Sequence, residues 1–127
     1  MVIIYTATPT VNAGSNQTVC GNNANVMLSG TSSTGTGIWT TGGTGIFTPS
    51  STTLSATYVP STADTTAGTV TLTLTSTNGC TPISQSITIT ITDAPNVNVG
   101  VDQFVCANNP NAALNGSVSG GASTGLW

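Results

Sequence analysis

The side chains best suited to acid, base, redox or metal chemistry are few in this sequence. They are three aspartates and three cysteines: Asp64, Asp93, Asp102, Cys20, Cys80 and Cys106. The chain contains no Lys, Arg or His, so no imidazole can serve as the base of a Ser-His-Asp or Cys-His mechanism. The cysteines are also too scattered to match the ligand spacing of a zinc site. We therefore predict a non-enzymatic protein with no catalytic, cofactor-binding or metal-binding residues in this sequence.

The same composition excludes some partners. Nucleic-acid binding draws its affinity from Lys and Arg side chains that neutralise phosphates, and this chain has neither. No apolar run approaches the ~20 residues that a membrane helix needs. We therefore expect neither nucleic-acid binding nor membrane insertion within these residues.

A long internal repeat organises the sequence. The stretch PTVNAGSNQTVCGNNANVMLSG (9–30) recurs as PNVNVGVDQFVCANNPNAALNG (95–116), with 12 of 22 positions identical and an offset of 86 residues. After a two-residue insertion, the Gly-Ile-Trp that ends at Trp39 recurs as the Gly-Leu-Trp that ends at Trp127. A fixed period of this kind is the mark of tandem units.

The repeat predicts three segments. Residues 1–7 precede Pro9 as ITITITD precedes Pro95, so they correspond to the last strand of a preceding repeat. Residues 8–93 form one complete repeat, and residues 94–127 form the first part of the next. We expect the chain to belong to a longer array in which neighbouring repeats are its first partners.

The complete repeat reads as short strands separated by turns. In 69–76, Val and Leu alternate with Thr, and in 83–92, Ile alternates with Ser and Thr, which is the two-residue period of a sheet with one buried face. Asn78-Gly79 between them suits a tight hairpin. About seven such strands and no helix predict an all-β fold, an immunoglobulin-like β-sandwich in tandem repeats.

The cysteines pair naturally within this scheme. Cys20 and Cys80 form an even pair in the complete repeat, and Cys106 repeats Cys20, so its partner would lie outside this sequence. We predict a Cys20–Cys80 disulfide, which could stabilise the unit by roughly 4 kcal/mol and would imply an oxidising compartment. The alternative is a pair of buried thiols.

The set of motifs V-C, L-x-G, G-x-W, G-x-G-x-F, Y-x-P-S-x-A-D and G-x-V-T-L-T-L-T, followed by a Cys and a T-I-T-I strand, covers the whole chain. It resembles the PKD-like or immunoglobulin-like tandem repeats of very large surface proteins of gliding Bacteroidota. This resemblance implies an extracellular, cell-surface adhesin of the gliding-motility type, exported by type IX secretion. Its repeats would act as a stalk or spacer in adhesion or gliding. Other copies in a filament, or a surface polysaccharide, would be further partners.

Two other functions fit the same sequence. The first is a carbohydrate-binding module, in which Trp39, Phe47 and Tyr58 would stack on sugars instead of packing in the core. The second is a spacer within a secreted multidomain enzyme.

Two short segments contain candidate sites for modification or metal binding, each with a simpler alternative. Asp64-Thr65-Thr66 resembles an O-glycosylation signal of the same phylum, which makes Thr65 a candidate site; a plain turn after Pro60 is the alternative. Asp93 and Asp102 flank Pro95, but two carboxylates fall short of the 6 to 8 oxygen ligands that calcium takes, unless backbone carbonyls contribute.

Overall fold

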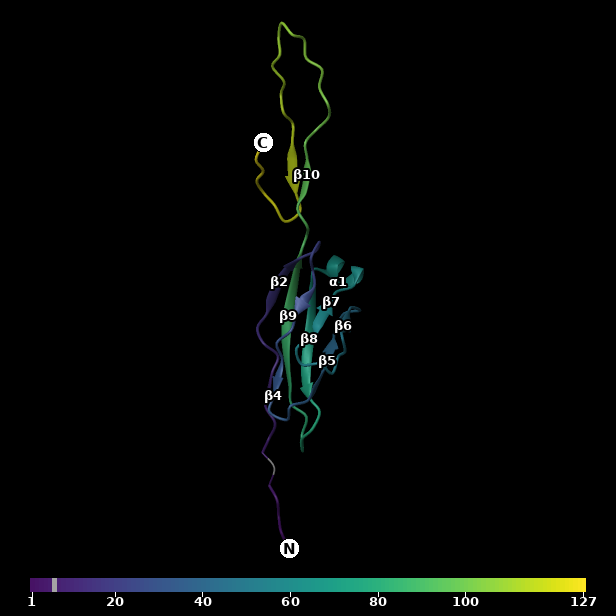
Figure 1. Cartoon of the computed structure of the whole chain (residues 1–127), viewed down its shortest axis with the longest axis vertical. Helices are drawn as coiled ribbons and strands as arrows, with labels where there is room; N and C mark the ends of the chain where they lie inside the picture. Colours follow the sequence, from purple (N-terminus) through teal and green to yellow (C-terminus); the bar gives the residue numbers. More distant parts are fainter. Residues whose placement is uncertain (6) are drawn as a thin grey trace.

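The computed structural model describes residues 1–5 and 7–127, and its centre is a sandwich of two β-sheets (Figure 1). One sheet has the order β2-β9-β8-β5, formed by Gln17–Cys20, Ser84–Thr92, Thr69–Ser76 and Gly37–Thr41. The other has the order β3-β7-β6, formed by Val26–Met27, Thr57–Val59 and Ile46–Thr48. The prediction of an all-β, sandwich-like fold is thus confirmed.

Two short strand pairs and one helix complete the described chain. β1 (Val11–Asn12) pairs with β4 (Thr31–Ser32), and β10 (Asn96–Asn98) pairs with β11 (Ser117–Ser119), both antiparallel. The helix α1 (Thr62–Ala67) lies between β7 and β8. The prediction that nothing helical interrupts the strands is therefore wrong. Ser61 caps α1 and Asp64 completes a capping box, a pattern visible in the sequence as Ser-x-x-Asp.

The alternation in the two longest strands builds the core. Along β8, Val70, Leu72 and Leu74 are buried while Thr69 and Thr71 face solvent, and the isoleucines of β9 follow the same rule. On the outer face, hydroxyl groups pair across the strands, with Thr73 Oγ1 2.8 Å from Ser86 Oγ and Thr75 Oγ1 2.7 Å from Ser84 Oγ. Cross-strand hydroxyl pairs take the place of the charged pairs found in many sheets.

The loop between these strands is longer than predicted. β8 ends at Ser76 and β9 begins at Ser84, so seven residues connect them, one more than the predicted strands 69–76 and 83–92 leave. Ser76 closes the base of this loop, because its backbone N–H donates to the Ile83 carbonyl and its hydroxyl accepts from the Ile83 N–H. The loop lies beside Pro9, where the chain enters the sandwich.

The two ends of the chain leave the sandwich in opposite directions (Figure 1). Residues 1–5 are extended and exposed, and the strand predicted for 1–7 has no partner among the described residues; Thr6, within that range, lies outside them. At the other end, β9 continues through Pro95 into the arm of residues 94–127. None of the helices in the described chain is long and apolar enough to cross a membrane.

The arm 94–127 repeats the local structure that begins the sandwich. Val11 pairs with Ser32 in the sandwich, and Val97 pairs with Val118 in the arm. Each residue of the second pair lies 86 positions after its counterpart in the first, which is the predicted offset. An isolated bridge joins Cys106 to Asn109, as one joins Cys20 to Asn23. The two segments therefore share the same strand register as well as the same sequence pattern.

Candidate functional site

The most highly connected polar group of the described chain is the carboxylate of Asp64. It is only 4% exposed, although it lies in the first turn of α1. Its Oδ1 accepts from the Thr44 N–H at 3.0 Å, and its Oδ2 accepts from the Gly45 N–H at 2.9 Å. Oδ2 also accepts from the Tyr58 hydroxyl at 2.7 Å and from the Ser61 N–H at 3.0 Å. We call this group of residues, Thr44, Gly45, Tyr58, Ser61 and Asp64, the Asp64 clasp.

The local sequence explains why the clasp forms. Gly43 and Gly45 let the backbone between β5 and β6 approach the carboxylate, because a Cβ on Gly43 would collide with Oδ1 and one on Gly45 would lie 2.5 Å from the Tyr58 hydroxyl oxygen. The capping box holds Asp64 from the other side, since its N–H donates to Ser61 Oγ at 3.1 Å. Two sequence patterns could have indicated the clasp, the G-x-G at residues 43–45 and the S-x-x-D at residues 61–64. Sequence reasoning placed Asp64 in a motif of the family resemblance and in a glycosylation motif, and it missed this arrangement.

Hydrogen bonds decide the charge state of the clasp. Burial alone would raise the pKa of Asp64, but the Ser61 N–H, the Tyr58 hydroxyl and the Thr44 N–H together lower this pKa to about 2. Burial raises the pKa of Tyr58, and the hydrogen bond to Asp64 raises it further. At neutral pH the clasp is thus an ionised carboxylate bound to a protonated phenol.

This geometry suits a structural tie. The donors to the Asp64 carboxylate come from the β5–β6 loop, from β7 and from the start of α1, so one side chain links three elements. A general base would need a reachable substrate proton, and these oxygens already accept protein donors. Among the described residues, no group of three or more His, Cys, Asp or Glu side chains is arranged to hold a metal ion.

The structure contradicts the predicted Cys20–Cys80 disulfide. Cys20 ends β2 and pairs with Thr92 at the C-terminal end of β9, whereas Cys80 lies in the loop before β9 begins at Ser84. The length of β9 separates these two positions, and nine residues at about 3.3 Å each span about 26 Å between first and last. A disulfide needs Cα atoms within about 7 Å. The alternative of buried thiols is wrong as well, because both side chains are exposed.

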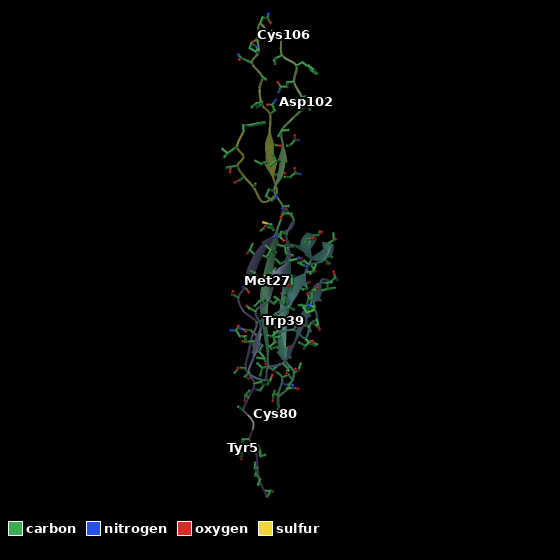
Figure 2. The ribbon with its side chains drawn as sticks, in the orientation of Figure 1. Tyr5, Met27, Trp39, Cys80, Asp102 and Cys106 are labelled. Atoms are coloured by element: carbon green, nitrogen blue, oxygen red, sulfur yellow. The ribbon has the colours of Figure 1, made fainter. Side chains whose placement is uncertain are left out.

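The cysteines instead mark the two ends of the sandwich. Cys20 lies at the end where the chain leaves toward the arm, and Cys80 lies near the N-terminal tail (Figure 2). Cys106 lies at the far tip of the arm (Figure 2). A pairing of Cys106 outside this sequence stays a prediction, and the argument for an oxidising compartment from an intrarepeat disulfide no longer holds.

We expect dithiothreitol to change the melting temperature of the chain by less than about 1 °C, because no Cys20–Cys80 cross-link stabilises the fold. Loss of a disulfide worth roughly 4 kcal/mol would lower the melting temperature of a domain of this size by more than about 15 °C. Circular dichroism melting curves with and without reductant measure the difference. A large drop on reduction would show that the two cysteines are joined in solution.

The candidate glycosylation residue lies on α1. Thr65 is half-buried, and its hydroxyl donates to the Thr62 carbonyl at 2.8 Å, whereas its neighbour Thr66 is exposed. The carboxylate of Asp64, the first residue of the motif, points into the clasp. The alternative of a plain turn is wrong, because these residues are helical.

The aromatic side chains proposed as sugar platforms pack inside the sandwich. Trp39 and Tyr58 are almost fully buried, and Phe47 lies between them. The centroid of the Phe47 ring is 6.4 Å from that of Trp39 and 5.1 Å from that of Tyr58. Trp39 Nε1 donates to the Leu54 carbonyl at 3.1 Å, which satisfies its only polar group. The core role is confirmed for Trp39 and Tyr58.

The two exposed aspartates are not gathered into a site. Asp93 borders a shallow hollow of about 410 Å³ at the end of the sandwich, lined by Gly21, Asn22, Thr65, Thr66, Thr92 and Ala94. Asp102 lies further out along the arm (Figure 2). The hollow therefore has one carboxylate and several hydroxyl groups.

Comparison of the chain with models of known protein families gave no match, and comparison with curated protein sequences gave no significant similarity.

Proposed function

We propose that this chain is a non-enzymatic spacer module of an extracellular, cell-surface adhesin or filament. The observation that carries the proposal is the path of the chain through the sandwich. The polypeptide enters beside the β8–β9 loop and leaves at the C-terminal end of β9, at the opposite end of the molecule (Figure 1). Units joined in this way add their lengths, as a stalk requires.

The strand pairing also suits a module that carries load. β2 and β9 run parallel, with Gln17 opposite Ile89 and Val19 opposite Ile91. A pull on the two ends of the chain draws β2 and β9 in opposite directions along their axes. The hydrogen bonds between them are then loaded together in shear, so they resist the force as a group.

The arm supports continuation of the array. Its first strand, β10, begins at Asn96 directly after Asp93-Ala94-Pro95, and it pairs in the register of the first unit. Pro95 has a restricted φ and biases Ala94 toward an extended conformation, which favours a stiff joint. The cell-surface location and the role in adhesion or gliding rest on the resemblance of the sequence motifs to surface repeats.

The experiment that tests this proposal is labelling of cells that produce the protein with an antibody against residues 8–93. We expect label on intact cells, at a level that permeabilisation does not increase. Time-lapse imaging then separates two forms of the proposal, because label that travels along the cell favours a motility adhesin and stationary label favours a stalk or coat filament.

Two outcomes would overturn it. Label that needs permeabilised cells would place the chain inside the cell. Antigen found only in the culture medium would favour the spacer of a secreted enzyme. A cytoplasmic protein detected in parallel serves as the control for cell lysis.

A further inference from the structure

The joint between the sandwich and the arm is held from both sides. Residues 93–94, which we call the linker, follow directly on β9. On the sandwich side, the Gly21 N–H donates to the Thr92 carbonyl at 2.8 Å, just before the linker begins. On the arm side, the loop that follows β11 places residues 120–121 against the linker backbone. The linker therefore lies between turns that belong to successive units of the chain.

The contact on the arm side is so close that only glycine fits it. A Cβ on Gly121 would lie 2.5 Å from the Asp93 carbonyl oxygen, and a Cβ on Gly120 would collide with the Ala94 carbonyl oxygen. Both obstacles are backbone atoms, which cannot swing aside as the end of a flexible side chain can. Two consecutive glycines thus let the loop and the linker pack backbone to backbone.

The register of the β10–β11 pair brings the loop to this position. Asn96 lies opposite Ser119 in the antiparallel pair, so the residues after Ser119 run back along the residues before Asn96. Figure 1 shows the chain after β11 turning at the base of the arm, beside the end of the sandwich. The contact with the linker is therefore a continuation of the strand pairing.

The corresponding loop of the sandwich does not make this contact. It consists of residues 34–36, whereas the loop of the arm consists of residues 120–124 and is two residues longer. In the short loop the Gly35 N–H donates to the Ser32 carbonyl at 3.0 Å, which turns the chain away early. A Cβ on Gly35 would meet nothing within 4 Å. The longer loop with its two adjacent glycines is thus what distinguishes the arm.

We propose that residues 120–121 clamp the linker and fix the orientation of the arm on the sandwich. The length of this loop then sets the stiffness of a joint, because a unit with the long loop grips the linker before it and a unit with the short loop does not. This inference deepens the spacer proposal, on which its biological meaning rests. A joint held in this way transmits direction as well as length from one unit to the next.

The first test measures distances between the sandwich and the arm by pulsed electron paramagnetic resonance on the 127-residue chain. In a background with Cys20→Ser, Cys80→Ser and Cys106→Ser, spin labels are attached at Thr71→Cys on β8 and Ser117→Cys on β11. Both positions are exposed, so the labels will not disturb the core. We expect a single narrow distribution of distances.

Gly121→Ala should displace the mean of this distribution or roughly double its width, because the new Cβ forces the loop off the Asp93 carbonyl. Gly121 is preferred to Gly120 for this test, since Gly120 has a φ of 75° that would strain any side chain. Gly125→Ala is the matched control. It adds the same methyl group to the arm, but at an ordinary contact distance of 3.5 Å from Val118, and should leave the distribution unchanged.

A second pair of variants separates the clamp from the stiffness of the linker itself. Replacement of residues 120–124 by the Thr-Gly-Thr of residues 34–36 should loosen the joint as Gly121→Ala does. Pro95→Ala keeps both glycines in place and should change the distribution less than Gly121→Ala. All of these positions lie outside the sandwich, so equal melting temperatures will show that its fold is unchanged.

Three results would overturn the proposal. The first is a broad distribution in the parent chain, or one that Gly121→Ala leaves unchanged. The second is an equal change in Gly121→Ala and Gly125→Ala, which would mean that any added methyl group disturbs the arm. The third is a larger change from Pro95→Ala than from Gly121→Ala, which would assign the stiffness to the proline. Cell labelling measures location and does not depend on the joint, so the spacer proposal and the clamp fail separately.

Discussion

Replacement of Asp64 by alanine is expected to lower the free energy of unfolding by about 3–5 kcal/mol. The change leaves the N–H groups of Thr44 and Ser61 without their acceptor. It also removes the charged acceptor of the Gly45 N–H and the Tyr58 hydroxyl, which keep only Tyr58 Oη and Thr41 Oγ1 as partners, respectively. Each orphaned donor costs about 1–3 kcal/mol, and the bonds to an ionised group are the stronger kind. Small domains have total stabilities of about 5–15 kcal/mol, so a loss of this size is a large share of the total.

Urea unfolding followed by circular dichroism measures this effect. Asp93→Ala is the matched control, since it removes the same carboxylate from an exposed position and should change stability by less than about 0.5 kcal/mol. Asp64→Asn keeps one acceptor oxygen, so its loss of unfolding free energy should lie between those of Asp64→Ala and Asp93→Ala. Equal stability of Asp64→Ala and Asp93→Ala would show that the clasp contributes little to the fold.

The clasp also predicts how stability varies with pH. The pKa of Asp64 is lowered from 3.8 to about 2 on folding, so the folded state favours the ionised form. The resulting stability, about 2 kcal/mol by linkage, is fully present above about pH 5 and is lost as the pH falls through 3.8 toward 2. Urea midpoints from pH 7 to pH 2 measure this loss. The Asp64→Asn variant should show a much flatter profile over the same range.

Replacement of Trp39 by alanine is the second change with a large expected effect, a loss of about 3–5 kcal/mol. The indole is 1% exposed and packs in the core beside Phe47. Its removal leaves a cavity that the two sheets cannot fully close, because the strands on either side are fixed by their ladders. It also leaves the Leu54 carbonyl without the indole N–H.

The repeat supplies a matched control for this variant. Trp127 holds the corresponding position in the arm but is 72% exposed, so Trp127→Ala should change the stability of the sandwich by less than about 0.5 kcal/mol. Urea unfolding followed by circular dichroism avoids a signal that depends on the deleted indole. A loss of similar size in both variants would mean that the arm and the sandwich unfold as one cooperative unit.

Local patterns in the sequence were sufficient for the strands that form the core. β8 occupies the residues predicted from its alternation, and β9 differs by one residue at its start. The reason is physical, since a two-residue period specifies which face of a strand is buried without knowledge of its partners. The short helix α1 was missed because only six residues form it, and its signal is a cap, not a periodicity.

The positions of the chemically reactive side chains depended on the tertiary structure. Cys20 and Cys80 were predicted to form a disulfide because the complete repeat contains an even number of cysteines. The parallel pairing of β2 with β9 instead places them at opposite ends of the sandwich. No local pattern encodes the direction in which distant strands run. The Asp64 clasp likewise gathers donors from residues 44 to 61, whose approach depends on how the two sheets stack. The sequence by itself determined the repeat, its period and the buried face of each long strand, because these follow from local spacing. Which side chains meet across the sandwich was decided only by folding, because those contacts join segments that are distant along the chain.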